Sequence, residues 1–210
     1  MQLKILPTGA FAANCSIVWN EPDKAMVFDP GADAALLIDE LRKNDLTPCA
    51  YILTHGHIDH ISALPEMLEE MSAPVYMHKN DAIWAFTPIN SIDGYESVKN
   101  MPKNIVTDIT DGSVIEAGTL TARVICTPGH TPGGMCCFFE SENLLIAGDT
   151  LFNGSVGRTD LPGGDWNTLE TSLSKLMELD DSTAVICGHG PNTTIGNERN
   201  ANPFINKTYI

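Results

Sequence analysis

Four apolar, strand-like runs of this chain each end in a turn of small residues that carries a potential metal ligand. The runs span residues 48–53, 122–126, 144–148 and 184–187, and the ligands that follow them are His55, His130, Asp149 and His189. A glycine stands beside each ligand, and glycine lets the backbone bend close to an ion. One polar residue in such a setting is usually a satisfied surface or core group. Four of them favour a metal site built from several strand ends.

The first of these turns, Thr54-His55-Gly56-His57-Ile58-Asp59-His60, holds three histidines and an aspartate. Imidazole is a strong ligand for zinc or iron, and a carboxylate adds an oxygen ligand. On extended backbone His55 and His57 point to the same side. Asp59 and His60 follow where the strand gives way to a helix-like run, so they can bind at a second position nearby. A helical zinc site would space its histidines at i and i+4, so this motif predicts a loop site.

The order His-x-His-x-Asp-His, then a single His, an Asp and a last His, resembles the signature of the metallo-β-lactamase-fold hydrolases. It runs from His55 to His189, so the resemblance covers essentially the whole chain. The stretches 148–152 and 157–165 resemble the glyoxalase II-like (hydroxyacylglutathione hydrolase-like) branch. The chain ends at Ile210, soon after His189, which is similar to a short form without the C-terminal helical region. The resemblance implies an α/β fold, a four-layer αββα sandwich, as a single domain over residues 1–210.

The resemblance also implies two neighbouring metal sites with a shared ligand. The first is held by His55, His57 and His130 and the second by Asp59, His60 and His189, with Asp149 bridging the two. Two divalent ions can share a water, lower its pKa and hold it against a carbonyl. Zinc is the expected metal, with iron and manganese as alternatives because both accept His and Asp ligands. Asp59, which would orient the nucleophile, and Asp149 are the expected catalytic residues.

The activity implied is hydrolysis of a small acyl thioester of the S-D-lactoylglutathione type by a metal-bridging hydroxide. Lactone or ester hydrolysis could use the same site. An alternative from another class is a mononuclear iron persulfide dioxygenase, which shares the scaffold and a stretch similar to residues 157–160. The complete set of second-site ligands favours the dinuclear hydrolase, because the dioxygenase needs open coordination positions on iron. A metal-binding protein without turnover is least favoured, since the ligand set would then serve no chemistry.

Phe152 and Arg158 follow the bridging aspartate and are candidates to line a substrate pocket. Arg158 is one of only 12 basic residues, so it is a candidate to meet a substrate carboxylate. The competing interpretation is an ion pair with Asp160 or Asp165. The segment 79–112 is the least regular part of the chain and could form a lid or wall beside the metals.

Asp29 and Asp149 each end the second strand of a predicted hairpin, over residues 16–28 and 134–148, so the chain reads as two similar halves. Asp29 is expected either to hydrogen-bond the metal loop and orient a histidine or to be an ordinary turn residue. His78, the histidine outside the ligand set, is expected to be structural.

Composition disfavours other classes of function. The formal net charge of −15 is a poor match for nucleic acid, whose binding depends on Lys and Arg. No apolar run reaches the ~18 residues of a membrane helix, and residues 1–7 do not resemble a signal peptide. The six cysteines lie in or beside apolar runs, which predicts buried thiols and a reducing, cytoplasmic location. The partner that the resemblance implies is a small-molecule thioester, and the oligomeric state is not indicated.

Three helices are predicted from apolar periodicity. Asp33 is a candidate N-cap for a helix over residues 34–43. A second helix follows the metal loop, with Leu64, Met67, Leu68 and Met71 on its buried side. A third is predicted to start at Asn167, with Glu170 three residues later.

Overall fold

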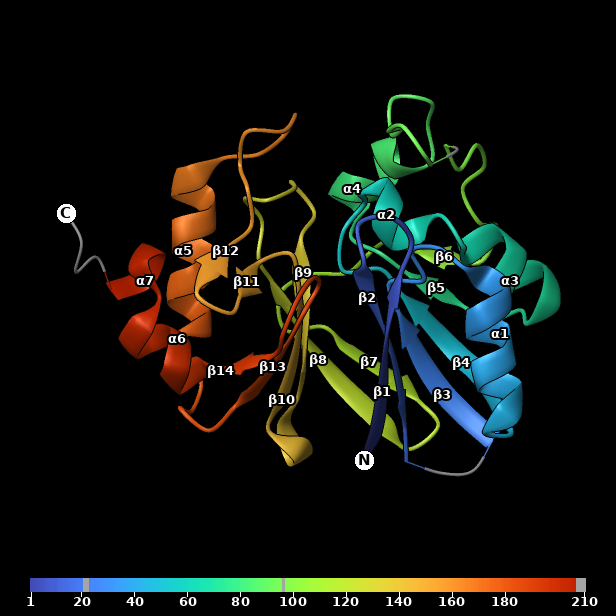
Figure 1. Cartoon of the computed structure of the whole chain (residues 1–210), viewed down its shortest axis with the longest axis horizontal. Coiled ribbons are helices and arrows are strands. Elements are labelled where there is room, and N and C mark those ends of the chain that lie inside the picture. The colour runs from blue at the N-terminus through green and yellow to red at the C-terminus, as the bar shows by residue number, and fades with distance from the viewer. Residues whose placement is uncertain (21–22, 96, 207–210) are drawn as a thin grey trace.

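The computed structural model describes residues 1–20, 23–95 and 97–206, in which two six-stranded sheets pack face to face between helices (Figure 1). The first sheet has the order β1 (Gln2–Thr8), β2 (Ala13–Trp19), β3 (Asp23–Phe28), β4 (Leu46–Ile52), β5 (Val75–Tyr76), β6 (Ile105–Val106). The second has the order β14 (Thr193–Thr194), β13 (Ala184–Cys187), β10 (Leu144–Gly148), β9 (Met135–Phe139), β8 (Leu120–Cys126), β7 (Val114–Ala117). A short hairpin pairs β11 (Leu151–Phe152) with β12 (Ser155–Val156).

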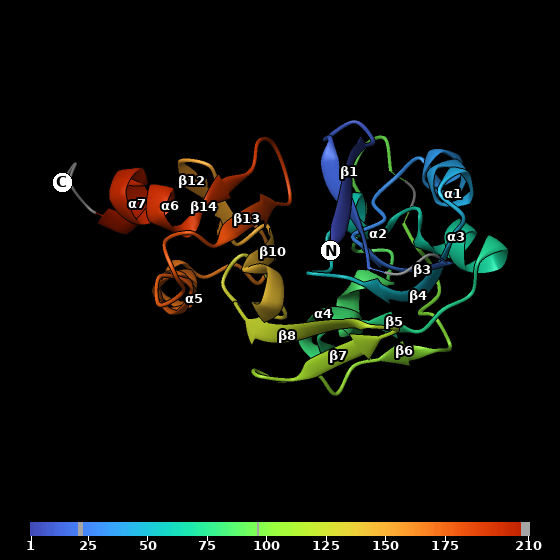
Figure 2. The same ribbon diagram turned by 90° about the horizontal axis from the view of Figure 1, so that it is seen from below.

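Helices cover the outer face of each sheet, which completes the four-layer αββα sandwich that the family resemblance implies. Beside the first sheet lie α1 (Ala34–Lys43) and α3 (Leu64–Glu70), and beside the second lie α5 (Trp166–Leu176), α6 (Ile195–Ala201) and α7 (Pro203–Asn206). Figure 2 shows the two helical layers on opposite sides of the paired sheets. The short helices α2 (Ile58–Ile61) and α4 (Lys79–Ala85) lie at the end of the sandwich where the metal loops gather. Within the described residues no helix is both long and apolar enough to cross a membrane.

The strands alternate between two apolar environments because successive strand side chains point to opposite faces of a sheet. On β3, Met26 and Phe28 face the space between the sheets, whereas Ala25 and Val27 face α1 and α3. The second sheet follows the same rule: Cys137 packs between the sheets, while Cys136 packs toward α5. Both faces of each sheet are therefore buried, which explains the uninterrupted apolar runs in the sequence.

The predicted similarity of the two halves is confirmed by strand pairing. The hairpin β2–β3 is antiparallel, and β3 then pairs in parallel with β4 after a crossover through α1. In the second half β9–β10 is antiparallel, and β10 pairs in parallel with β13 after the α5 crossover. Asp29 and Asp149 thus follow equivalent strands, β3 and β10. The tip of the first hairpin, residues 21–22, lies outside the described residues.

Two predicted helix starts are corrected. Helix α1 spans the predicted residues, but Asp33 has a left-handed backbone, and its Oδ2 accepts from the Gly9 amide at 2.8 Å instead of capping the helix. Helix α5 begins at Trp166, because Asp165 is the N-cap and accepts from the Thr168 amide. The segment predicted to be irregular includes α4, whose N-cap is His78. Its Nδ1 accepts from the Asn80 amide at 3.2 Å, in keeping with a structural role.

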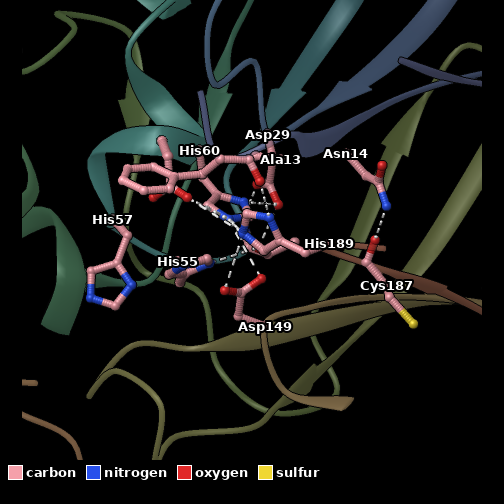
Figure 3. A network of polar contacts seen from close by, with 12 residues as sticks. Ala13, Asn14, Asp29, His55, His57, His60, Asp149, Cys187 and His189 are labelled. Carbon is pink, nitrogen blue, oxygen red and sulfur yellow. Dashed lines mark hydrogen bonds and ion pairs between the residues drawn. The ribbon is translucent and has the colours of Figure 1, made fainter. Parts of the chain in front are cut away.

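All six cysteines lie within the described residues and are free thiols, as the sequence predicts. Burial raises the pKa of Cys187, the thiol nearest in sequence to His189, to about 12, so this thiol stays protonated. Figure 3 shows its sulfur directed away from the histidine cluster.

Candidate metal centre

The seven predicted ligands come together although they come from four separate strand ends. Figure 3 shows five of them, His55, His57, His60, Asp149 and His189. The turn after β4 supplies His55 and His57, and α2 supplies Asp59 and His60. His130 follows β8, Asp149 follows β10 and His189 follows β13. Strand β4 belongs to the first sheet, whereas β8, β10 and β13 belong to the second. Both halves of the sandwich therefore contribute predicted ligands.

The first group consists of His55, His57 and His130, whose potential ligand atoms lie within 4.8 Å of one another. His57 Nδ1 and His130 Nε2 are 2.9 Å apart. His55 Nε2 is buried and has no hydrogen-bond partner among the described residues. A buried polar atom without a partner is costly, unless a cation takes the place of the missing donor.

The second group consists of Asp59, His60 and His189, also within 4.8 Å. His60 Nε2 lies 3.1 Å from His189 Nε2 and 3.7 Å from Asp59 Oδ2. His189 Nε2 lies 3.4 Å from the same carboxylate oxygen. Two imidazole nitrogens and one carboxylate oxygen that converge on a point are a suitable donor set for a divalent ion.

Asp149 lies between the two groups. Its Oδ2 is 3.6 Å from His130 Nε2 of the first group and 3.5 Å from His189 Nε2 of the second. Its Oδ1 is 3.5 Å from His60 Nε2, yet it is buried without a hydrogen-bond partner in the described chain. Together with the unpartnered nitrogen of His55, this oxygen shows that the residues fit bound divalent metal.

Glycine is required beside the carboxylate of Asp149. A Cβ at Gly188 would collide with Asp149 Oδ1, and a Cβ at Gly148, where φ is +49°, would collide with the Thr54 side chain. The small residues in these turns therefore let the two strand ends approach each other closely enough to share the site.

Hydrogen bonds at Nδ1 orient the imidazole rings of four of the five histidines in the two groups. His130 Nδ1 lies 2.7 Å from the Arg158 carbonyl, and His189 Nδ1 lies 3.0 Å from the Phe11 carbonyl. In each ring the bonded Nδ1 leaves Nε2 directed into the cluster, an arrangement typical of metal-binding histidines. His55 and His60 follow the same pattern, with Thr54 Oγ1 at 3.1 Å and Asp29 Oδ2 at 3.1 Å from their Nδ1 atoms.

Asp29 contacts the metal loop as well as a histidine. Its Oδ1 accepts from the Thr54 amide at 2.7 Å and its Oδ2 from the Thr54 hydroxyl at 2.6 Å, in addition to the contact with His60 Nδ1. Asp29, His55 and His60 also lie close enough to form a ligand group. The oxygens of Asp29 are already occupied by donors, however, so this carboxylate orients the loop.

The charges of the metal-free cluster differ between the two groups. Burial, together with the neighbouring His130, lowers the pKa of His57 to about 3, and burial also lowers the pKa of His55. Burial acts in the same direction on His60, but Asp149 and Asp29 outweigh it and raise the pKa of His60 to about 10. The pKa of His189 is also raised, because Asp59 and Asp149 outweigh burial. His55 and His57 therefore favour the neutral form, whereas His60 and His189 favour the protonated form.

A cavity of about 800 Å³ opens onto the ligands. Its walls are largely apolar and include Phe11, Trp84, Ile89, Ile92, Phe152, Val156 and Leu161. Part of the segment predicted to form a wall, residues 84 and 89–92, does line it. Phe152 lies at the cavity with its ring 6.2 Å from that of His189.

Arg158 also lines the cavity, but its guanidinium is paired. Its Nε and one terminal nitrogen each donate to Asp160 at 2.7 Å, and both side chains are more than half exposed. Of the two aspartates proposed as partners, Asp160 is the one in contact, whereas Asp165 caps α5. An exposed ion pair contributes little to stability, so Arg158 can exchange this partner for an anionic group.

The comparison with protein families agrees with this geometry. The model of the Metallo-beta-lactamase superfamily matches residues 8–189, which include all seven predicted ligands. The chain belongs to the metallo-β-lactamase superfamily. The family match and the structure together confirm the predicted fold.

Relatives of this metallo-β-lactamase superfamily protein match over nearly the full chain. The probable metallo-hydrolase YqgX of Bacillus subtilis is 36% identical, and the match covers 98% of each chain. The hydroxyacylglutathione hydrolase GloC of Haemophilus influenzae is 33% identical, with 98% of this chain and 99% of GloC covered.

Several solved structures also match nearly the whole of this chain. The B3 metallo-beta-lactamase BLEG-1 has a TM-score of 0.90 and 38% identity, covering 97% of this chain and 99% of BLEG-1. TTHA1623 in a di-iron-bound form has a TM-score of 0.83 and 31% identity, covering 96% and 99%. ETHE1 from Myxococcus xanthus has a TM-score of 0.77 and 25% identity, covering 98% and 84%.

Several residues of the centre are missed by reasoning from sequence. Phe11 supplies the carbonyl for His189 and one wall of the cavity. The Asn14 side chain donates to the carbonyls of Cys187 and Gly190, at 2.9 and 3.1 Å, and so holds the His189 turn. Phe11 lies in the β1–β2 turn and Asn14 near the start of β2, both far in sequence from any predicted ligand, and no local pattern marks them.

Proposed function

We propose that this protein is a dinuclear metal-dependent hydrolase of small acyl thioesters of the S-D-lactoylglutathione type, acting in the cytoplasm. The position of Asp149 carries the proposal, because its carboxylate lies within 3.6 Å of nitrogens from both ligand groups. A shared carboxylate is the feature that makes two adjacent triads one dinuclear site. The cytoplasm suits a chain whose six thiols are all free.

The ligand set supports hydrolysis without an amino-acid nucleophile. Bound divalent ions would supply a hydroxide near neutral pH and polarise the acyl oxygen. Asp59 lines the cavity. Burial acts to raise its pKa, but His189 and His60 together outweigh burial and lower it to about 2. Its carboxylate therefore remains ionised, and it can accept a hydrogen bond from water and orient it toward the acyl carbon. Attack there forms a C–O bond and breaks the C–S bond, and the thiolate leaves.

The cavity supports a small organic substrate. A volume of about 800 Å³ lies within the usual range of ligand pockets, as do apolar walls with a few polar groups. We assign Phe152 to the wall that holds the acyl or thiol portion, and Arg158 to a carboxylate of the substrate. The resemblance to GloC over nearly the whole chain supports a glutathione thioester as the first compound to test.

The test is turnover of S-D-lactoylglutathione by protein of known metal content, followed by the loss of thioester absorbance. Turnover should disappear in Asp149→Ala and persist in Asp39→Ala, which removes an exposed carboxylate of α1. Unchanged turnover in Asp149→Ala with both metals retained would contradict the bridging role. A protein with two metals and no thioesterase activity would contradict the proposed substrate class and direct the search to lactones and esters.

The metal itself is part of the test. We propose zinc, with iron as the alternative that the di-iron form of TTHA1623 favours. Elemental analysis of protein expressed in media supplied with each metal gives both identity and stoichiometry. One iron per chain, with oxygen consumed in the presence of glutathione persulfide, would favour the dioxygenase over the hydrolase.

A second candidate is β-lactam hydrolysis, which the similarity to BLEG-1 favours, with 38% identity and a TM-score of 0.90. The same hydroxide would attack the lactam carbonyl, and the amide nitrogen would leave in place of sulfur. A chromogenic cephalosporin measured beside the thioester ranks the two by kcat/KM. A larger kcat/KM for the cephalosporin would replace the thioesterase proposal.

A further inference from the structure

Asp81, a carboxylate of α4 outside the ligand set, is completely buried beside the first ligand group. Ionised side chains are almost never fully buried without partners. Three donors from two different loops surround Asp81, and each belongs to a turn that carries ligands of the first metal site.

The donors connect the two ligand turns through one carboxylate. The amide of Gly56, between His55 and His57, donates to Asp81 Oδ2 at 2.9 Å. The hydroxyl of Thr131, next to His130, donates to the same oxygen at 2.7 Å, and the Gly133 amide donates to Oδ1 at 2.6 Å. Burial raises the pKa of Asp81, whereas these donors and the Trp84 side chain act in the opposite direction.

Helix α4 fits between the turns at van der Waals distance. A Cβ added to Gly133 would lie 2.7 Å from the Asp81 amide nitrogen, and one added to Gly56 would lie 2.9 Å from the Trp84 ring. Asn90 donates to the Gly56 carbonyl at 2.7 Å. The N–H and the C=O of Gly56 are therefore both hydrogen-bonded by residues of the segment 81–90. Among the described residues, no hydrogen bond of Asp81 reaches a member of the second ligand group, which is oriented by Asp29 and by Phe11.

We propose that Asp81 is a positioning residue for the first metal site, where it fixes the spacing between the His55–His57 turn and the His130 turn. An amide at this position would present an N–H to at least one donor, so the two turns would separate or rotate. The role is indirect, because Asp81 contacts no ligand side chain in the described structure. The proposal rests on the metal centre of the proposed function but not on its substrate.

The experiment measures zinc affinity in proteins that keep one complete triad. His189→Ala retains the first triad and His57→Ala retains the second. Asp81→Asn is introduced into each, and zinc is titrated against a chromogenic chelator. The expected result is about 10- to 100-fold weaker binding in the His189→Ala background, the range seen when residues that orient metal ligands are lost. In the His57→Ala background the change should stay below about threefold, within ordinary additivity.

Glu198→Gln is the matched control. Glu198 is 2% exposed and also accepts from three donors, the Gly154 amide, the Thr193 hydroxyl and the Asn202 side chain. None of these donors belongs to a turn that carries a ligand. The control should lower Tm as Asp81→Asn does, yet leave zinc affinity in the His189→Ala background unchanged. Tm is therefore the readout of structure, and zinc affinity is the readout of positioning.

Equal weakening of both triads by Asp81→Asn, or weakening matched by Glu198→Gln, would overturn the proposal. Loss of zinc binding in His189→Ala alone would overturn the first site itself, whereas tight zinc binding without thioester turnover would contradict only the proposed substrate. If Asp81→Asn does not fold, Thr131→Val removes one donor with little change in shape. It should weaken the first triad in the same direction by a smaller factor, and an unchanged affinity would refute the positioning role.

Discussion

The two metal sites should differ in the number of protons that they release when a metal binds. In the second group, His60 Nε2 and His189 Nε2 lie 3.1 Å apart, so a proton must occupy the space between them in the metal-free protein. The carboxylates of Asp149 and Asp29 overcome burial and raise the pKa of His60 to about 10. His60 is therefore an imidazolium at neutral pH, and an ion that binds Nε2 must displace its proton.

His55 and His57 of the first group have no such proton to lose. Burial lowers the pKa of His55 and takes that of His57 to about 3, so both rings are neutral at pH 7. The 2.9 Å contact between His57 Nδ1 and His130 Nε2 requires one N–H. A metal that binds both atoms would move that proton to the other nitrogen of the same ring, which is a change of tautomer.

The magnitude follows from linkage. Below a pKa of about 10 the proton on His60 competes with the metal, so affinity at the second site rises with pH. One displaced proton corresponds to a tenfold change in affinity, or about 1.4 kcal/mol, for each pH unit. Zinc binding should release about one proton at the second site from His60 and almost none from His55 and His57 at the first, between about pH 6.5 and 8.5.

Calorimetric zinc titrations in two buffers of different ionisation enthalpy give the number of protons released. His57→Ala reports on the second triad, and His189→Ala reports on the first. Affinity measured at about pH 6.5, 7.5 and 8.5 gives the slope independently. A flat profile for the second triad, or a steeper slope for the first than for the second, would refute the assignment of charge in the metal-free cluster.

Three further substitutions test the site. Asp149→Ala should lower metal content and abolish turnover, since its carboxylate faces both groups; metal analysis and kinetics on one preparation check this. Asp29→Asn should weaken zinc at the second triad by about 10- to 100-fold and lower the free energy of unfolding by about 2–3 kcal/mol, measured by titration and by urea unfolding; no change would leave Asp29 a turn residue. Arg158→Ala should raise KM several-fold if the guanidinium binds substrate, whereas unchanged kinetics with a lower Tm would favour the ion pair with Asp160.

The four-layer sandwich was implied by the resemblance to the family, whereas the positions of several strands and of the ligand turns were predictable because they follow local rules. Strands β10 and β13 match the predicted runs, and β8 is longer by two residues at its start. The ligand turns could be recognised because histidine, aspartate and glycine are unusual directly after buried strands. The first residues of the helices were harder to predict, because an aspartate before a helix can accept a hydrogen bond either from that helix or from a distant segment. Asp33 bonds the Gly9 amide, 24 residues away, whereas Asp165 caps its own helix.

The residues that support the site could not be found in this way, because their partners are distant in the chain. Asp81 accepts from Gly133 across 52 positions, and Asn14 donates to Cys187 across 173. Each is an ordinary polar residue in a local window. Only the packing of α4 and of the β1–β2 turn against the ligand loops gives them their partners, and that packing depends on the whole sandwich.

The pair Asp29 and Asp149 shows why sequence position alone does not separate a ligand from a residue that orients ligands. Both follow the second strand of an equivalent hairpin. Both oxygens of Asp29 accept from Thr54, and one of them also lies 3.1 Å from His60 Nδ1. Asp149 Oδ1 has no donor among the described residues and lies 3.5 Å from His60 Nε2. A carboxylate already filled with N–H and O–H donors fixes the backbone and the imidazole, whereas one buried without a donor needs a cation. The number of donors that reach each carboxylate therefore separates the two roles, and it is set by contacts across the sandwich.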